Sequence, residues 1–173
     1  IAIHASLTGH LVLSSLHTND AAGAIPRFLA MGIKPFLLAP ALNAVIAQRL
    51  VRRICESCKE VMTLAPEVLD RVKALLRAIS PASGEKVDLT KTTFYHGKGC
   101  PACHGIGLKG RVGIFEVLTM NPEIERIILS EQISEHVMQE IAVRHGMILM
   151  VQDGLLKAMK GMTTVDEVFR VAQ

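Results

Sequence analysis

The residues best suited to chemistry in this sequence are four cysteines, which stand in two Cys-x-x-Cys knuckles. Cys55 and Cys58 form the first knuckle, "CESC", and Cys100 and Cys103 form the second, "CPAC". A zinc ion takes four thiolate or imidazole ligands at the corners of a tetrahedron, and each knuckle supplies two. The surrounding glycines, at positions 97, 99, 105 and 107, suit a backbone that turns tightly around a metal. The spacing predicts a structural zinc centre with no open position for a substrate.

Other uses of these cysteines have to be weighed against zinc. Two disulfides fit poorly with a sequence in which we find no secretory signal, because reducing compartments keep thiols free. A thioredoxin-like redox pair would explain one knuckle but not two. His96 and His104 are near enough in sequence to replace a cysteine as ligand, although we expect them to be surface residues or neighbours of the site.

A second candidate for chemistry is the apolar stretch "LTGHLVLSSLHTND", which carries His10 and His17. The run Leu11–Leu16 predicts a buried strand of a parallel sheet. On a strand, residues seven apart face opposite sides and lie about 23 Å apart, so the two histidines cannot share one metal. Ligands bind beyond the carboxyl ends of strands in open parallel sheets, which favours His17, with Thr18 and Asn19, as the position that faces a ligand. The alternative, in which either histidine is a satisfied core or turn residue, stays open on this argument.

Length, composition and charge bound the class of protein. Half of the 173 residues are apolar and 20% are charged, as in globular proteins with one sizeable core. No apolar run reaches the ~18 residues that a membrane-spanning helix needs. The net charge of +3 comes from basic residues mixed with acids, and the chain has one Tyr and no Trp, so we expect no nucleic-acid partner.

The elements that must position these residues follow from local signals. "IAIHASL" predicts the end of a helix, Asp20 is expected to cap a helix over "AAGAIPRFLAM", and "KPFLLAPALNA" predicts another. Pro26 should kink the second of these helices or mark its boundary. Alternation predicts strands over 46–54 and 111–118.

Between and after these strands we expect mainly helices. "PEVLDRVKALLRAI" predicts an amphipathic helix and "TTFYH" a short strand, within a segment 55–103 that we expect to fold around its own nucleus. Helices should begin at Asn121-Pro122 and at Ser134, and Thr164 with Glu167 predicts a capping box before the last one.

Four blocks of sequence, in order along the chain, resemble one known family. The blocks are "LTGHLVLSSLHTNDAAGAIPRFLAMGI", "VIAQRLVRRICESC", "GKGCPACHGIGLKGRVGIFEV" and "DGLLKAMKGMTTVDEVFRV". They resemble the secretion ATPases that power type II secretion and type IV pilus assembly. The first block resembles the family's histidine box, and the cysteines resemble its tetracysteine zinc subdomain. The resemblance weakens only between Thr63 and Thr93.

The resemblance implies an α/β fold: a partial RecA-like core, an inserted small tetracysteine zinc subdomain and a C-terminal helical subdomain. Residues 1–54 and 111–119 would belong to the core, 55–110 to the zinc insertion and 120–173 to the helices. The resemblance further implies a cytoplasmic homo-hexamer, peripheral to the bacterial inner membrane, that binds ATP and Mg²⁺ between subunits. Its partners would be an inner-membrane platform and cytoplasmic recruitment proteins.

Roles carried over from the family attach to particular residues. His17 would sense the γ-phosphate or order the catalytic acidic residue, and His10 would support it. Thr8 and Thr18 would orient this box through their hydroxyls. Arg49 would face the nucleotide or a neighbouring subunit, with a strand arginine satisfied by solvent or an acid as the alternative.

One departure from the family concerns the phosphate-binding loop. The sequence contains no G-x-x-x-x-G-K-[ST] motif and no acidic strand end that could hold Mg²⁺. In the family both precede the histidine box, so we expect a piece that carries the zinc site and part of the nucleotide site and does not hydrolyse ATP alone. The resemblance does not separate secretion from pilus assembly.

Two other classes remain as alternatives. "CPACHGIG" fits C-x-x-C-x-G-x-G, the knuckle of a class of co-chaperones, so the chain could be a zinc-dependent protein-interaction module. Those proteins use four such repeats, whereas this sequence has one. A zinc-ribbon nucleic-acid binder is disfavoured by the charge and the scarcity of aromatic residues.

Overall fold

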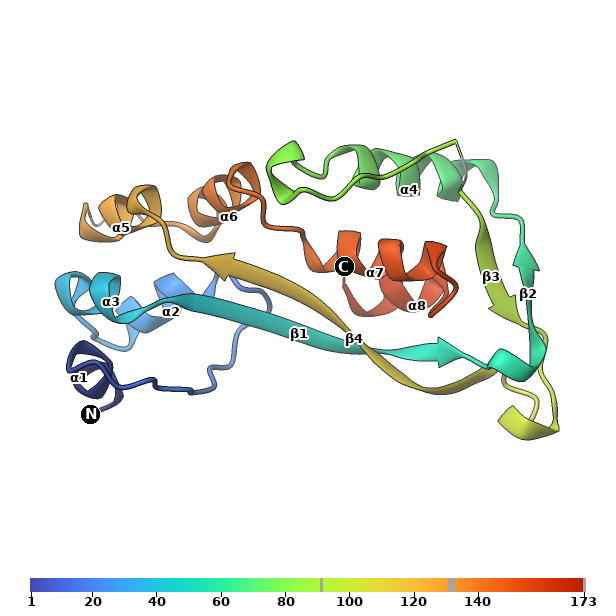
Figure 1. The fold of residues 1–173 in the computed structure, drawn as a ribbon, viewed down its shortest axis with the longest axis horizontal. Coiled ribbons are helices and arrows are strands. Elements are labelled where there is room, and N and C mark those ends of the chain that lie inside the picture. The colour runs from blue at the N-terminus through green and yellow to red at the C-terminus, as the bar shows by residue number, and fades with distance from the viewer. Residues whose placement is uncertain (91, 131–132, 173) are drawn as a thin grey trace. The chain divides into compact units, whose positions relative to one another are not determined.

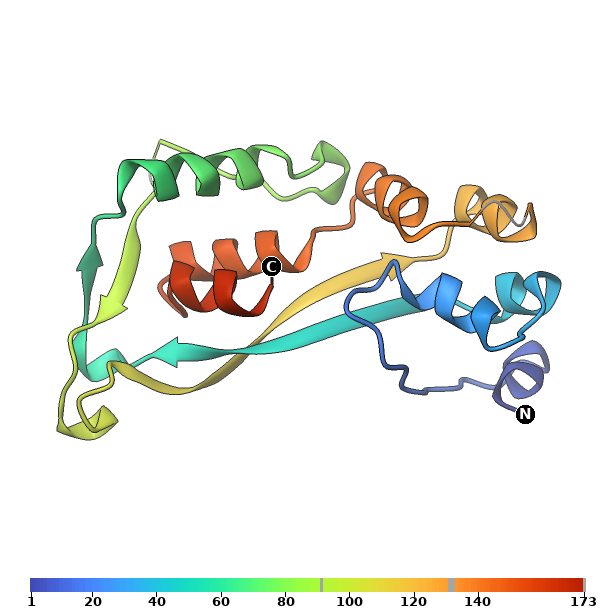
Figure 2. The same ribbon diagram turned by 180° about the vertical axis from the view of Figure 1, so that it is seen from behind.

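The computed structural model describes residues 1–90, 92–130 and 133–172 and has a mixed α/β fold (Figures 1 and 2). The chain divides into two compact units. The first unit comprises Ile1–Ala47 and Glu116–Met147, and the second comprises Gln48–Phe115 and Ile148–Gln173. Among the described residues, no helix combines the length and hydropathy that a membrane span requires. The boundaries of these units differ from the domain boundaries expected from the sequence. The expected domain boundaries stay predictions.

Two long strands carry the chain from one unit to the other. β1 (Ala44–Ile54) pairs with β4 (Leu108–Thr119), and the two strands run side by side in both views (Figures 1 and 2). The Met120 N–H donates to the Asn43 carbonyl at one end and the Cys55 N–H to the Gly107 carbonyl at the other, so the strands are antiparallel. In β4 the side chains alternate between buried and exposed from Ile114 onward. The strands predicted over 46–54 and 111–118 are therefore confirmed.

The first unit packs short helices against one another. They are α1 (Ala2–Leu7), α2 (Ala24–Ala30), α3 (Pro35–Ala41), α5 (Pro122–Leu129) and α6 (Glu135–Arg144). α3 contacts α1 and α5, and α6 contacts α2 and α5. Asn121 caps α5 and Ser134 caps α6 with their side-chain oxygens, as predicted.

The start of α2 differs from the sequence prediction. The Asp20 carboxylate accepts the Gly23 N–H at 2.7 Å, which closes a turn ahead of the helix instead of capping the helix itself. α2 then begins at Ala24, so Pro26 falls in the first turn. The proline needs no N–H there, because that turn has no preceding carbonyl to bond.

The prediction of a buried strand over Leu11–Leu16 is wrong. This stretch has no regular secondary structure and belongs to neither of the two sheets found among the described residues. Leu11 and Leu13 are 84% and 88% exposed, so the apolar run is not buried as the prediction required. The physical reason is that a strand needs a neighbouring strand for its N–H and C=O groups, and an apolar run alone does not supply one.

The second unit combines a two-stranded antiparallel sheet with three helices. β2 (Lys59–Met62) and β3 (Phe94–Gly97) pair antiparallel with Lys59 opposite Gly97 and Met62 opposite Phe94. The helices are α4 (Pro66–Arg77), α7 (Met150–Met159) and α8 (Val165–Val171), and three short 3₁₀ turns lie at η1 (Glu56–Cys58), η2 (Pro81–Ser83) and η3 (Pro101–Cys103). The predicted amphipathic helix and short strand are both present.

One apolar core holds the second unit together. It joins side chains from α4 and β3 to side chains from α7 and α8; the buried members are Leu64, Val72, Leu76, Phe94, Leu155, Leu156, Ala158, Val165 and Val168. Residues between the two cysteine knuckles therefore share their core with the C-terminal helices. The expectation that segment 55–103 folds around its own nucleus is wrong, because one amphipathic helix cannot bury its apolar face without a partner.

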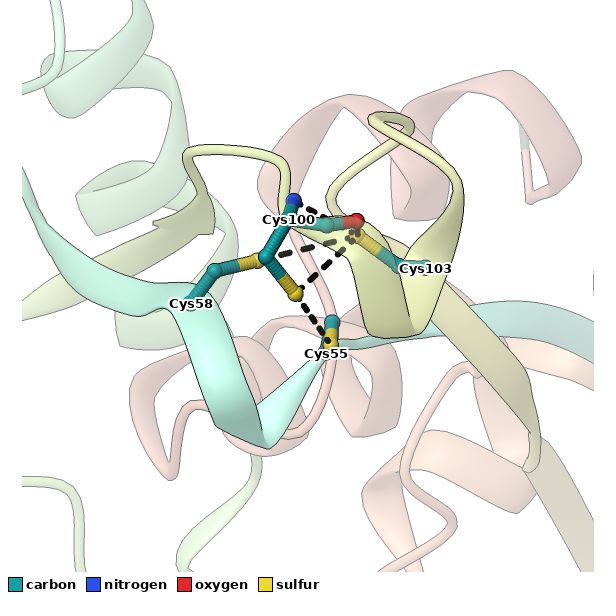
Figure 3. A group of neighbouring side chains, drawn as sticks. All are labelled: Cys55, Cys58, Cys100 and Cys103. Carbon is teal, nitrogen blue, oxygen red and sulfur yellow. Dashed lines mark hydrogen bonds between the residues drawn. The ribbon is translucent and has the colours of Figure 1, made fainter.

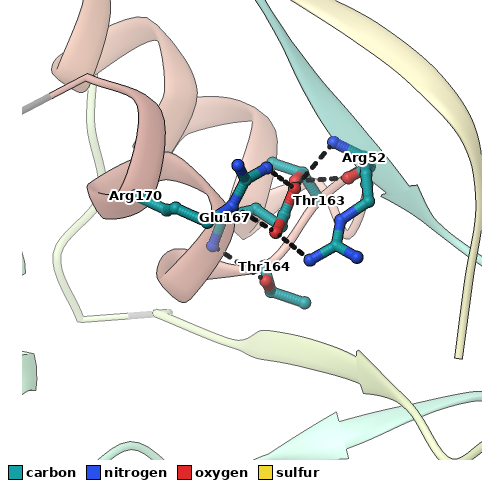
Figure 4. Close-up of polar contacts among 5 residues, drawn as sticks. All are labelled: Arg52, Thr163, Thr164, Glu167 and Arg170. Atoms are coloured by element: carbon teal, nitrogen blue, oxygen red, sulfur yellow. Dashed lines mark hydrogen bonds and ion pairs between the residues drawn. The ribbon is translucent and has the colours of Figure 1, made fainter. Parts of the chain in front are cut away.

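A buried carboxylate fastens α8 to β1 (Figure 4). The Glu167 side chain is 4% exposed and accepts hydrogen bonds from the Arg52 guanidinium at 2.6 Å and the Arg52 N–H at 3.0 Å. The Arg170 guanidinium adds two more bonds, at 2.7 and 2.9 Å. The Thr164 hydroxyl caps α8 at the Glu167 N–H, but the carboxylate turns to the arginines instead of completing the predicted capping box. The hydrogen bond with Arg52 is the first cause that holds the pKa of Glu167 down, at about 2.

Candidate metal centre

The ends of four strands bring the two cysteine knuckles together. β1 runs directly into Cys55 and the turn η1, while β3 leads through Gly99 into Cys100 and the turn η3, from which the chain enters β4. The pairing of β2 with β3 aligns the exit of the first knuckle with the entry of the second. Across this gap, the Lys98 N–H donates to the Cys58 carbonyl at 2.9 Å. Figure 3 shows the result, with all four side chains pointing toward one centre.

The sulfur positions match those around a tetrahedral zinc ion. All four Sγ atoms lie within 4.8 Å of one another. The distances Cys55–Cys100 and Cys58–Cys103 are each 3.8 Å, and Cys100–Cys103 is 3.7 Å. A Zn–S bond of about 2.3 Å places the corners of a tetrahedron about 3.8 Å apart. The donor set suits zinc, and the three separations of 3.7 to 3.8 Å match the edges of such a tetrahedron.

Backbone N–H groups surround part of the sulfur cluster. Cys103 Sγ accepts from the Cys100 and Gly107 N–H groups, each at 3.2 Å, and Cys58 Sγ accepts from the Gly99 N–H at 3.3 Å. These donors stabilise thiolate charge, which is the form that binds a metal. Burial opposes ionisation of Cys103, but the two N–H groups together with hydrogen bonds from neighbouring thiols outweigh it and lower its pKa to about 6. Burial, with hydrogen bonds to the other three thiols, raises the pKa of Cys58 to about 12, and the Gly99 N–H opposes this shift.

Glycines allow the backbone to close around the sulfurs. A Cβ at Gly97 would lie 1.9 Å from the Gly107 carbonyl oxygen, and a Cβ at Gly107 would lie 2.2 Å from that of Gly97. A Cβ at Gly99 would meet the Gly105 oxygen at 2.5 Å. The stretches "GKG" and "GIG" thus pack backbone to backbone, where no side chain fits. The sequence prediction of a tight, glycine-dependent turn at this knuckle is confirmed.

The same geometry bears on the alternatives for the cysteines. All four cysteines are free, and the measured sulfur separations of 3.7 to 3.8 Å are far beyond the ~2.05 Å of a disulfide. His96 pairs with Glu60 across the β2–β3 sheet at 3.0 Å, and His104 is exposed at a φ of 53°. Neither histidine joins the group of four sulfurs.

The histidine box lies in the first unit, and its residues belong to no regular strand. His10 and His17 are both exposed. His10 Nδ1 lies 3.1 Å from the Thr8 hydroxyl, which itself donates to the Ala5 carbonyl at 2.8 Å. The structure thus brings Thr8 and His10 together, whereas the Thr18 hydroxyl donates to the Asp20 carbonyl at 2.9 Å.

A groove of about 690 Å³ in the first unit adjoins this box. It is lined by α1, by residues 12–16 and 18, by α2 and α3, and by the start of β1. Thr18 lines the groove, and the described lining includes neither of the two histidines of the box. Arg49 is an exposed residue of β1 and belongs to the second unit. The roles assigned to these residues from the sequence stay predictions.

Comparison with known proteins identifies the family. The model of the family described as "Type II/IV secretion system protein" matches residues 1–170. The chain belongs to this family. The match covers both the histidine box and the four cysteines, and it is a different family from the co-chaperones weighed as an alternative.

Named members of the type II/IV secretion system family match nearly the whole chain. The Type IV pilus assembly ATPase PilB of Thermus thermophilus is 44% identical over 97% of this chain and 18% of its own length. The Type II secretion system protein E of Pseudomonas aeruginosa is 42% identical over 100% of this chain and 32% of its own length. The Type II secretion system ATPase E of Vibrio cholerae is 41% identical with the same coverage. The chain thus spans a third or less of these family members.

Proposed function

We propose that the chain is the C-terminal part of an ATPase that drives type IV pilus assembly or type II protein secretion. The observation that carries the proposal is the match of 41 to 44% identity across almost the whole chain to relatives named as such proteins. A structure with four converging sulfurs agrees with the zinc subdomain expected of such an ATPase. The relatives are named for both processes, so the proposal covers both.

The zinc ion is proposed as a structural cofactor. Cys55, Cys58, Cys100 and Cys103 would hold it, and four sulfurs leave no position for water or substrate. Its contribution would be to fix the junction of β1, β2, β3 and β4, because the two knuckles lie where these strands meet.

The nucleotide site is proposed to be shared with the rest of the full-length protein. ATP and Mg²⁺ would bind there, with His17 sensing the γ-phosphate, His10 supporting it, and Thr8 and Thr18 orienting the box. Arg49 would face the nucleotide or a neighbouring subunit. The exposure of both histidines supports this assignment, because a phosphate-sensing side chain has to reach its ligand. The 173 residues contain no P-loop motif, so this chain alone should not hydrolyse ATP.

The assembly and its surroundings complete the proposal. The full-length protein would act as a RecA-like homo-hexamer in the bacterial cytoplasm, peripheral to the inner membrane, with a membrane platform and recruitment proteins as partners and no nucleic acid. The support is the family membership, whose relatives are named for secretion and pilus machines.

The test measures ATP hydrolysis and assembly size of the full-length protein that contains this chain. We expect hydrolysis, a ring-sized assembly, and a large loss of turnover on His17→Ala. His136→Ala is the matched control, because His136 is 78% exposed on α6 and outside the box. Full activity of His17→Ala would contradict the role of this histidine, and the absence of any hydrolysis by the parent protein would contradict the proposed function.

A further inference from the structure

Glu116 is a buried carboxylate of β4 that lies against the end of the histidine box. It is 5% exposed, and its Oε2 atom accepts the Ala21 N–H at 3.1 Å, across 95 positions of sequence. Both residues belong to the first unit. A carboxylate is costly to bury unless it accepts hydrogen bonds, so the bond to Ala21 helps to keep it in place.

Ala21 marks the point at which the chain after the histidine box becomes buried. In the described stretch 1–20 no residue is buried, whereas Ala21 and Ala22 are 0% and 1% exposed. His17, four positions before Ala21, is exposed. A buried backbone N–H needs a partner, and at the first buried residue beyond the histidine that partner is Glu116.

Local hydrogen bonds connect this anchor with the histidine. The Thr18 hydroxyl donates to the Asp20 carbonyl at 2.9 Å, and the Asp20 carboxylate accepts the Gly23 N–H at 2.7 Å. These two bonds close a turn around the N–H group that Glu116 holds. His17 is attached directly to the first residue of that turn, so a shift of the anchor would move its imidazole.

A second carboxylate, that of Glu135 on α6, reaches the same turn in a different way. A Cβ at Gly23 would lie 3.2 Å from Glu135 Oε2 and 3.1 Å from Asp20 Oδ1, so the two carboxylates converge there. The charge of Asp20, together with a hydrogen bond between the two groups, raises the pKa of Glu135. Glu135 thus meets another acid at the turn, whereas Glu116 accepts a backbone N–H group and is the better anchor.

We propose that Glu116 is a positioning residue for the nucleotide site: its carboxylate holds the Ala21 N–H and thereby sets the place of His17 at the γ-phosphate of ATP. The inference rests on the proposed function, in which His17 senses that phosphate. Glu116 acts through the turn that carries the histidine. Its effect on turnover follows from the precision that catalysis requires, because a displacement of about 1 Å can cost about 100-fold in rate.

The experiment uses the full-length protein that contains this chain and compares Glu116→Met with Glu116→Gln. The two substitutes are similar in length, but only glutamine has an oxygen that can accept the Ala21 N–H. We expect Glu116→Met to lower the turnover number for ATP by about tenfold or more, and Glu116→Gln to stay within about twofold of the parent. The control Glu140→Ala should keep the parent turnover, because Glu140 is 64% exposed on α6.

ADP affinity and a double variant separate positioning from a general role in the fold. ADP has no γ-phosphate for His17 to meet, so its affinity should be unchanged in Glu116→Met. If Glu116 acts through His17, Glu116→Met should cost no further turnover in a His17→Ala protein, to within about twofold.

Several outcomes overturn the inference. They are parent-like turnover of Glu116→Met, equal losses in the Met and Gln variants, and a further loss of about tenfold in the double variant. Weakened ADP binding or loss of the ring-sized assembly in Glu116→Met also overturns it, because Glu116 then serves the fold of the first unit. The failure of the proposed function looks different: the parent protein does not hydrolyse ATP, or His17→Ala keeps full turnover, before Glu116 is changed.

Discussion

Replacing Glu167 by Gln tests how strongly the buried carboxylate fastens α8 to β1. The change keeps the size of the side chain and removes its charge. Its interactions with Arg52 and Arg170 lower the pKa of Glu167 from the ordinary 4.5 to about 2. At about 1.4 kcal/mol for each pH unit, this difference corresponds to about 3 kcal/mol of folding free energy. This free energy is an upper bound, because the Arg52 and Arg170 side chains are 50% and 55% exposed and water screens their charges in part.

The sign of the pH dependence follows from the direction of the pKa difference. The folded state holds the carboxylate more strongly as an anion than the unfolded chain does. Its contribution is therefore complete above pH 4.5 and disappears as the pH falls toward about 2. Glu167→Gln imitates the protonated form, so its stability deficit at pH 7 should lie between about 1 and 3 kcal/mol and should shrink progressively below pH 4.5.

The assay is urea unfolding of the zinc-loaded chain, followed by circular dichroism between pH 3 and pH 7. Zinc affinity also falls in acid, so the relevant quantity is the difference between parent and variant at each pH. Glu56→Gln serves as the control, because Glu56 is 64% exposed and its pairs with Arg53 and Lys59 are long, at 3.6 and 3.9 Å. A deficit below about 1 kcal/mol at pH 7, or one that does not change with pH, would refute the reasoning.

Three further predictions concern the metal, the glycines and the core. Chelation of the metal should raise amide hydrogen exchange in β2, β3 and η3 while α5 and α6 keep their protection; unchanged exchange in β3 would count against a structural metal. Gly97→Ala should lower zinc affinity measured by competition with a chromogenic chelator, because its Cβ would meet the Gly107 oxygen, and exposed Lys98→Ala should not. Leu76→Ala should lower the free energy of unfolding, measured in urea, by about 2 to 5 kcal/mol, because Leu76 is buried. Exposed Leu129→Ala should lower it by less than about 0.5 kcal/mol, and similar losses for the two variants would argue against the described core.

Local signals allowed several elements and the convergence of the four cysteines to be predicted from the sequence. The Cys-x-x-Cys spacing sets the geometry of two ligands within one turn, and glycines mark the backbone that must close on them. Asn121 and Ser134 cap helices with atoms that lie only two or three residues from their partners. Such features survive in almost any tertiary context, because their interactions are made within a few residues of the chain.

Features that depend on distant partners escaped prediction. The Leu11–Leu16 run has the composition of a buried strand, yet nothing in a single sequence shows whether a neighbouring strand is present. The contact of Glu167 with Arg52 joins residues 115 positions apart. The local pattern with Thr164 pointed instead to a capping box, which the structure completes only by half. The shared core likewise joins segments that are far apart in sequence, because α4 precedes β4 along the chain and α7 and α8 follow it.

The pairing of cysteines across the two knuckles also constrains how the chain can unfold. The paired sulfurs belong to residues 45 positions apart, so a zinc ion held by both knuckles closes the intervening chain into a loop. If the ion stays bound as the rest of the unit melts, it restricts the denatured chain as a covalent cross-link would. The chain-entropy relation for a loop of this length gives about 4 kcal/mol. The bound ion would then affect the unfolded ensemble as well as the native fold. During refolding the two knuckles would not have to find each other again, because the ion would already hold them together.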